Sequence, residues 1–383
     1  MMKQVSTIKN KKRRVLILLP AVILFQGLLL LWGHVQAQSP KQVPFEMKKG
    51  MNISAWLSQN TFTSDAERAA YFTEADLKQL KALGFDHVRL PVAEINIYDE
   101  NGNPKTEAIK LIHRTIEWCR AADMRIILDC HQTRDHDFSR YSSIVLFSDP
   151  NALPRFIDLW NRLSHEFGKY PDTLLAYELL NEPNAKENQS WNNIALPLIK
   201  SIREREPERV ILLGSNKANR VTTFGDLKVP KNDPNIILSF HFYYPYLITH
   251  FNSDAYKSLK VIKGPLTYPG KIVADSIAKN LDEASQKVLE KHNGVFNRQV
   301  LYEMIAPAIK KARDTGLRLH CGEFGVNFQY PDRALLTRYM EDIVSIFKEN
   351  DIPYTVWGYR KQFGVFDDGR KIKDQRYLDA IVK

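Results

Sequence analysis

The sequence predicts a closed (β/α)₈ TIM barrel, an α/β fold built as a single domain. Short β-rich runs alternate with helical patterns, which is typical of parallel strands joined by helices. Eight such runs occupy the chain after residue 38. An open doubly wound sheet is the alternative architecture, but no GxGxxG turn follows the first run.

Helices are expected between the first strands because apolar side chains recur there with helical spacing. A segment over residues 73–83 carries three leucines on one face and stops at Gly84. Residues 109–119 and 156–167 show the same spacing, and a glycine follows the second of them. Glycine directly after the last apolar position is a common helix end.

The predicted strands are runs rich in β-branched, aromatic and other apolar residues. In chain order they are KGMNISAW (49–56), FDHVRLP (85–91), MRIILDCH (124–131), LLAYELLNEP (174–183), RVILLGSN (209–216), NIILSFHFYY (235–244), RLHCGEFGV (318–326) and YTVWGYR (354–360).

The connection between the sixth and seventh predicted strands is the longest, running from Tyr243 to Glu323. It carries an aromatic, loop-like stretch, and helical patterns follow from Lys271 onward. A connection with a single helix would need fewer residues. In a barrel, such an excess is expected to lie over the active face.

The amino terminus resembles an export signal. Its first fourteen residues include six basic and no acidic side chains, and an apolar run over residues 15–33 leads to Val35-Gln36-Ala37. This order predicts a secretory signal peptide over residues 1–37, cleaved after Ala37, and a barrel domain over residues 38–383. The protein would then be secreted or periplasmic. An uncleaved, outward-facing membrane anchor is the alternative, because nineteen apolar residues nearly span a bilayer.

The charge of the chain argues against a nucleic-acid partner. The sequence has 54 basic and 44 acidic residues, a formal net charge of +10. Six of the basic residues lie in the signal, so the remaining chain is near +4. Binding to nucleic acid would favour basic residues clustered on one face. We expect a monomer.

The three cysteines, Cys119, Cys130 and Cys321, are an odd number without CxxC spacing. A disulfide framework or a zinc knuckle is therefore not expected, and buried free thiols are. Cys321 lies two residues before Glu323, but no base adjacent in sequence supports it as a nucleophile.

Polar or aromatic residues end most of the predicted strands. The carboxyl ends of barrel strands share one rim, so side chains distant in sequence are expected to converge on one cleft there. Trp56 lies just beyond the end of the first strand. The residues at the strand ends are Asn52, Arg89, His131, Asn181, Glu182, His241, Tyr243, Glu323 and Trp357.

Such a cleft would hold two carboxylates, Glu182 and Glu323. Cleavage at an acetal carbon needs a proton donor for the leaving oxygen and a carboxylate to meet the oxocarbenium-like centre, and two glutamates can supply both. Pro183 biases the residue before it toward extended geometry, so we expect it to aim Glu182, while Asn181 holds sugar hydroxyls.

The set of motifs resembles the cellulase-type family 5 of glycoside hydrolases, in the family's order and over nearly the whole chain after the signal. The resemblance implies a retaining β-glycoside hydrolase without cofactor or required metal. The carboxyl groups of such an enzyme stand about 5 to 5.5 Å apart. The motifs are RLP at Arg89, DCH at His131, ELLNEP at Glu182, HFY at His241 and Tyr243, GEFG at Glu323 and VWGY at Trp357.

The resemblance also implies roles. Glu182 would be the general acid/base and Glu323 the nucleophile, with Arg89 stabilising the charge of Glu323. His241 would lie near Glu182, and Tyr243 would touch Glu323. Sugar contacts would come from Asn181 to the 2-hydroxyl, from His131 to hydroxyls and from Trp357 as a stacking floor, since an indole face suits the apolar face of a pyranose. Asn52 and Trp56 complete the expected binding residues.

Several side chains invite a second interpretation. Glu178 and Glu182 are four residues apart, so on a strand both side chains would point to the same side. At Glu178, however, a buried, paired structural carboxylate is expected. Asp129, Asp135 and His136 surround His131, yet no HxH or HExxH spacing supports a metal site. The remaining aromatic residues near the strand ends are expected to serve packing.

Substrate identity stays open at this level. Asn216 stands where many family members carry a tryptophan, and the first strand is not the most usual cellulase version. The first hypothesis is an endo-β-1,4-glucanase (cellulase) acting on a β-linked glycan. A mannanase, a xyloglucanase or another β-glycosidase of the family is the alternative. A non-catalytic carbohydrate-binding barrel and a membrane-anchored metal hydrolase are the rivals from other classes.

Overall fold

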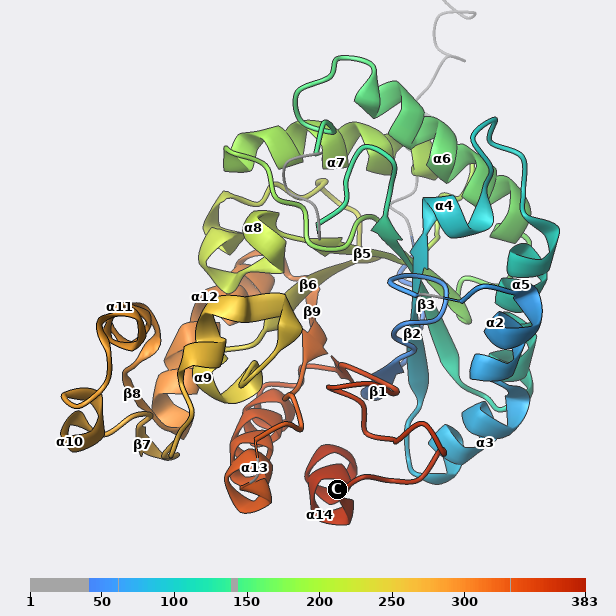
Figure 1. Ribbon diagram of the computed structural model, residues 1–383. Helices are drawn as coiled ribbons and strands as arrows, with labels where there is room; N and C mark the ends of the chain where they lie inside the picture. Colours follow the sequence, from blue (N-terminus) through green and yellow to red (C-terminus); the bar gives the residue numbers. More distant parts are fainter. Residues whose placement is uncertain (1–40, 61, 139–143, 331) are drawn as a thin grey trace, which may run out of the picture. The chain divides into compact units, whose positions relative to one another are not determined.

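Eight parallel strands close into a barrel in the computed structural model, which describes residues 41–60, 62–138, 144–330 and 332–383 (Figure 1). The predicted TIM barrel is confirmed, and each barrel strand overlaps a predicted run, although β2 and β3 extend two residues and one residue beyond theirs. β1 pairs with both β2 and β10, which closes the sheet. The strands are β1 (Lys49–Asn52), β2 (His87–Ala93), β3 (Arg125–Gln132), β4 (Leu175–Glu178), β5 (Ile211–Gly214), β6 (Ile236–Phe242), β9 (Arg318–Phe324) and β10 (Tyr354–Val356).

Helices surround the barrel, and the three predicted from spacing are α3, α5 and α6 (Figure 1). Thr73 caps α3, donating its backbone N–H to the Asp76 carboxylate at 2.8 Å. The helices are α2 (Asp65–Tyr71), α3 (Glu74–Ala82), α4 (Glu94–Ile97), α5 (Thr106–Ala121), α6 (Ala152–Phe167), α7 (Asn188–Arg203), α8 (Asn216–Asn219), η2 (Val221–Asp226), α9 (Tyr246–Thr249), η3 (Asp254–Val261), α10 (Asp275–Ala278), α11 (Glu283–His292), α12 (Arg298–Thr315), α13 (Arg333–Glu349) and α14 (Gln375–Val382).

The amino-terminal end of the barrel is closed by an apolar floor. Val43, Phe45 and Met47 precede β1 and pack with inward residues of β3 to β6, which include Ile127 and Ile237. A hydrogen bond of 2.8 Å from the Val43 backbone N–H to the Asn235 side chain holds this segment in place.

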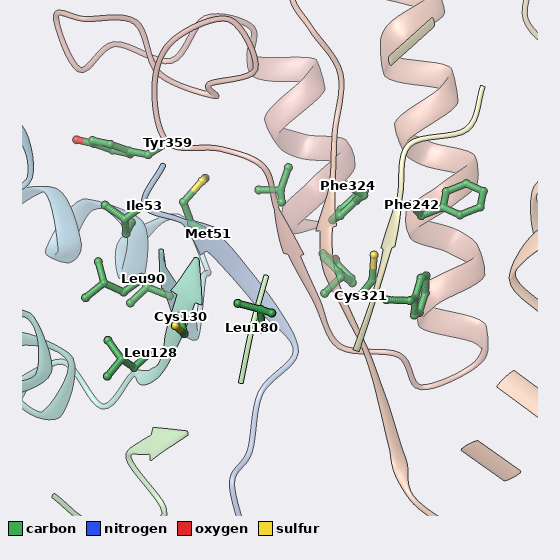
Figure 2. Packing of buried hydrophobic residues seen from close by; sticks show 14 of the residues in the cluster. Met51, Ile53, Leu90, Leu128, Cys130, Leu180, Phe242, Cys321, Phe324 and Tyr359 are labelled. Atoms are coloured by element: carbon green, nitrogen blue, oxygen red, sulfur yellow. The ribbon is translucent and has the colours of Figure 1, made fainter. Parts of the chain in front are cut away.

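A second apolar cluster fills the space between the barrel and its helices. Figure 2 shows Cys130 and Cys321 within it, beside Leu128, Leu180 and Phe324. The three cysteines are buried and unpaired, as predicted. Burial raises the pKa of the Cys321 thiol well above its usual value, so the thiol is not activated.

The long connection after β6 divides into two parts. Its aromatic first part stays at the rim, where the Tyr243 and His250 rings lie 5.0 Å apart. Its second part contains a small antiparallel sheet of β7 (Gly270–Lys271) and β8 (Val295–Phe296), which the sequence did not predict. That sheet lies with α10 and α11 beside the barrel, so the expectation that the whole excess covers the active face was wrong (Figure 1).

Within the described part of the chain, no helix is long and apolar enough to cross a membrane. The predicted signal over residues 1–37 lies outside the described residues.

Gly50→Ala should destabilise the fold. A Cβ at Gly50 would lie 2.1 Å from Nε2 of His87. That ring cannot move freely, because His87 is buried and hydrogen-bonded to Asp86 at 2.6 Å and to Thr355 at 2.9 Å. Overpacking of this kind costs about 1–3 kcal/mol, which thermal unfolding would detect.

Gly225→Ala is the control, because an added Cβ there meets no atom within 4 Å. Equal melting temperatures for the two variants would contradict the close packing at Gly50.

Candidate active site

The rim at the carboxyl ends of the strands gathers eight of the predicted site residues into one connected set. They come from β2, β3, β6 and β9 and from the loops that follow β4, β6 and β10. Hydrogen bonds, ion pairs and one ring stack link them all, partly through Asp129. They are Arg89, His131, Asn181, Glu182, His241, Tyr243, Glu323 and Trp357.

Arg89 is the centre of this set and is fully buried. Its Nη1 donates to Oε1 of Glu323 at 2.8 Å, and its Nε donates to Oε2 of Glu178 at 2.6 Å. Its Nη2 lies 3.0 Å from Oδ2 of Asp129. One guanidinium therefore neutralises charge on three carboxylates and fixes the direction of Glu323.

Glu178 and Asp129 form the base of the site. Glu178 is the buried, paired structural carboxylate that the sequence predicted. Burial raises the pKa of Asp129 to about 7, against the opposing charge of Arg89. It also raises the pKa of Glu178, with Arg89 again opposing it. The raised pKa values show that, for these two carboxyl groups, the cost of burying a charge outweighs the attraction of the shared guanidinium.

The backbone at Glu182 differs from the prediction. Extended geometry was expected before Pro183, but Glu182 has a φ of +46°, in the left-handed region. β4 ends at Glu178, and the chain then turns sharply. Two backbone hydrogen bonds hold the turn, from the Asn181 N–H to the Cys130 carbonyl at 2.9 Å and from the Ala218 N–H to the Pro183 carbonyl at 3.1 Å. Tertiary contacts therefore outweigh the local bias of the proline.

Glu182 lies in a poorly solvated environment, with its side chain 18% exposed. Burial raises the pKa of Glu182 to about 7, and His131, Arg89 and Arg220 oppose that rise. Its Oε1 lies 3.0 Å from Nδ1 of His241. Burial lowers the pKa of His241 to about 4, so this imidazole is neutral at pH 7. Glu182 can therefore hold a proton near neutral pH.

The two glutamates face each other at short range. One donor atom each from Glu182, His241 and Glu323 lies within 4.8 Å of the others. An oxygen of each glutamate therefore lies no more than 4.8 Å from the other, which agrees with the close carboxyl groups of retaining glycosidases, about 5 to 5.5 Å apart, rather than the wider gap of inverting enzymes. Tyr243 donates to the other oxygen of Glu323 at 3.0 Å.

The same three side chains are also the one group in the described part of the chain with the donor spacing of a metal site. Two carboxylates and an imidazole are ligands that zinc accepts. Near His131, Asp135 pairs with Arg155 at 2.8 Å.

Trp357 and His131 form one wall of the site. Their rings are stacked 5.7 Å apart at an angle of 7°, and Trp357 remains partly exposed. Nδ1 of His131 lies 2.6 Å from Oδ2 of Asp129, and burial lowers the pKa of His131 to about 3. Nε2 of His131 is buried and has no hydrogen-bond partner among the described residues.

Two predicted sugar-binding residues do not reach the surface, and those predictions were wrong. Trp56 is fully buried, packs on Phe72 at 5.4 Å and donates its indole N–H to the Arg68 carbonyl. Asn52 is also fully buried, and its Oδ1 accepts from Arg89 at 2.9 Å. The chain bends inward after β1, so Trp56 joins the core and Asn52 supports the guanidinium.

Asn219 is a site residue that the sequence did not indicate. Its Nδ2 lies 3.3 Å from Nε2 of His241. It comes from the loop after β5, in which no pattern separates it from Asn216. Asn216, which stands where many family members carry a tryptophan, is buried, and its Oδ1 accepts from the Ala185 N–H at 2.8 Å.

Known proteins resemble this chain both in sequence and in fold. The family model for cellulase (glycosyl hydrolase family 5) matches residues 48–362. The chain belongs to glycosyl hydrolase family 5. The glycoside hydrolase family predicted from the motifs is thereby confirmed, and the protein is an O-glycosyl hydrolase of the retaining type.

Curated relatives and solved structures agree with this family 5 assignment. Endoglucanase C of Acetivibrio thermocellus is 31% identical over 340 residues, which cover 88% of this chain and 98% of that protein. The cellulose synthase subunit Z of Clostridioides difficile aligns with a TM-score of 0.70 at 21% identity, covering 88% of this chain and 100% of that one. Structures of Thermotoga maritima Cel5A with cellobiose and with mannotriose each align with a TM-score of 0.69 at 21% identity, over 88% of this chain and 100% of theirs.

Glu182→Gln should stabilise this family 5 enzyme at pH 8 and change little at pH 4. The folded pKa of about 7 lies above the unfolded value, so ionising Glu182 costs folding free energy. That cost is absent below about pH 4, grows up to about pH 7 and is complete above it, reaching about 1–3 kcal/mol. Urea unfolding at pH 4, 6 and 8 measures it.

Glu303→Gln, at an exposed position on α12, is the matched control and should be neutral throughout. An equal gain for Glu182→Gln at every pH would contradict the raised pKa.

Proposed function

We propose that the protein is an endo-β-1,4-glucanase in which Glu182 is the general acid/base and Glu323 the nucleophile. The observation that carries the proposal is the facing pair of carboxylates within 4.8 Å, one bound to a buried guanidinium and the other poorly solvated. The likeness to Endoglucanase C supports the choice of β-1,4-glucan, because it extends over nearly the whole length of that protein.

In the first step, Glu323 attacks the anomeric carbon and forms a glycosyl ester. The bond from that carbon to the glycosidic oxygen breaks, and the proton of Glu182 passes to the departing oxygen. Arg89 and Tyr243 each hold one oxygen of Glu323, which orients the carboxylate for attack. The raised pKa of Glu182 keeps the acid protonated near pH 7.

In the second step, a water molecule attacks the anomeric carbon and the ester bond to Glu323 breaks. Glu182, now ionised, takes a proton from that water and returns to its starting state. Two inversions give overall retention of the anomeric configuration. The hydrogen bond between His241 and Glu182 supports the ionised form between the two steps.

The sugar would lie against Trp357, the partly exposed aromatic wall of the site. The neutral ring of His131 offers Nε2 to a hydroxyl group. Asn181 is oriented by its Oδ1, which accepts from Arg89 at 2.9 Å, so its amide nitrogen is left to donate to the 2-hydroxyl. We infer no need for a cofactor or a metal ion, because both carboxylates have protein partners that suit acid and nucleophile roles.

We also propose that the protein is exported as a monomer. The basic and apolar residues of the first 37 positions support export, either as a cleaved signal or as an anchor that faces the catalytic domain outward. A polymeric β-glycan outside the cell is the substrate that such an enzyme would meet.

Leaving-group dependence tests the two glutamates. Glu182→Ala should slow hydrolysis of aryl cellobiosides with poor leaving groups by about 10²-fold or more. In the first step, substrates with good leaving groups should be slowed far less, because these groups depart without protonation. Glu323→Ala should abolish turnover of both. Pre-steady-state release of the aryl group measures the effect. Equal loss across the series in Glu182→Ala would remove its acid role.

A panel of defined polysaccharides tests the specificity. We expect the largest rate on mixed-linkage or carboxymethylated β-1,4-glucan, with a rapid fall in viscosity that marks internal cleavage, and retained activity in a chelator. Faster hydrolysis of mannan or xyloglucan would replace the substrate assignment. Binding without any hydrolysis would favour a non-catalytic barrel, and loss of activity in the chelator would favour a metal hydrolase.

A further inference from the structure

The loop after β5 has an unusual backbone. Lys217, Ala218 and Asn219 have φ values of +57°, +63° and +53°, so three consecutive residues are left-handed. The Ala218 N–H donates to the Pro183 carbonyl at 3.1 Å. This strained turn is thereby attached to the turn that carries Glu182. Strained backbone persists where the surrounding structure determines it, often at functional sites.

The turn places the Asn219 side chain inside the end of the barrel, where it is fully buried. It lies directly over Gly214, because a Cβ at that glycine would be 2.3 Å from Oδ1 of Asn219. Its Nδ2 points to Nε2 of His241 at 3.3 Å. Oδ1 has no hydrogen-bond partner among the described residues. Within the described part of the chain, the hydrogen bond of this side-chain amide is therefore with the imidazole.

With the amide in this orientation, the contact selects which nitrogen of His241 carries the proton. A neutral imidazole has one N–H and one lone pair, and an amide N–H needs a lone pair to accept it. Nε2 is then the acceptor and Nδ1 carries the hydrogen. Nδ1 lies 3.0 Å from Oε1 of Glu182, so Oε1 accepts a hydrogen bond from the ring.

We propose that Asn219 is a positioning residue for the glycosidase reaction, because its amide holds His241 in the Nδ1–H tautomer and so confines the acid proton of Glu182 to Oε2. The inference rests on the proposed role of Glu182 as acid/base. With Oε1 occupied by the ring N–H, the proton points away from His241 and toward the leaving oxygen. The same N–H supports the carboxylate once the proton has left.

Asn219→Asp reverses this arrangement with nearly the same shape. An aspartate accepts from Nε2–H, and Asp tolerates the left-handed backbone as Asn does. Nδ1 of His241 then becomes an acceptor that draws the Glu182 proton toward the ring, or the ring becomes an imidazolium. Transfer to a poor leaving group should slow about tenfold or more, within the range that general acid catalysis contributes.

The tautomer can be read directly by ¹⁵N NMR of the full-length protein labelled at histidine, with the His241 signals assigned by their loss in His241→Gln. In the wild-type protein, Nδ1 should be the protonated and Nε2 the unprotonated nitrogen. Asn219→Asp should show a protonated Nε2. A wild-type His241 protonated at Nε2 would overturn the proposal.

Two further variants separate positioning from folding. Asn219→Gly keeps the left-handed turn and removes the amide, so it should give a mixture of tautomers even if Asn219→Asp does not fold. Ala218→Gly, in the same turn and half-buried, should keep the wild-type tautomer and leaving-group dependence. A wild-type tautomer in Asn219→Gly would contradict the proposal.

Kinetics complete the test. Asn219→Asp should lower rates for poor leaving groups by about tenfold or more while rates for good ones change by less than about threefold. An equal fall for both classes would show a merely structural role. If Glu182→Ala spares poor leaving groups, the proposed function fails while the tautomer result stands. If Glu182→Ala behaves as an acid variant but the tautomer is unaffected by Asn219, only this inference fails.

Discussion

One buried guanidinium is the interaction on which the site depends. Arg89 binds Glu323, Glu178 and Asp129, and water cannot replace these partners because the arginine side chain is fully buried. Removing one member of such a buried set leaves uncompensated charge, which typically costs about 3–5 kcal/mol. The eight-stranded barrel keeps the set together, because β2, β3, β4 and β9, which carry these four side chains, surround one interior. The oxygens of Asn52 and Asn181 complete the enclosure.

The two glutamates proposed as catalytic differ because their neighbours differ. Glu323 lies against a permanent cation and a phenol, which favour a carboxylate ready to attack. Glu182 lies among poorly solvated, neutral imidazoles, and its pKa is raised to about 7. The two residues have the same side chain, so their environments alone would make one the proton donor and the other the nucleophile. The tyrosine, the histidines and the arginine act on these two groups, which explains why all of them belong to one connected set.

Sequence reasoning recovered the parts of the molecule that follow from periodicity. The alternation of apolar runs and helices predicted each barrel strand, and the polar residues at strand ends predicted most of the rim. It failed where contacts between residues distant in sequence determine the local structure. Trp56 is buried by its contact with Phe72, and Glu182 adopts a left-handed backbone through contacts of its turn with β3 and with the loop after β5. Asn219 could not be found, because its importance lies in its distance from His241 and in the glycine beneath it.

The apolar floor beneath the barrel has a consequence for how the enzyme meets its substrate. Val43, Phe45 and Met47 seal the base of the barrel, at the end opposite the rim that holds the two glutamates. A glycan chain would therefore approach the glutamates from the rim, because apolar side chains fill the opposite end of the barrel.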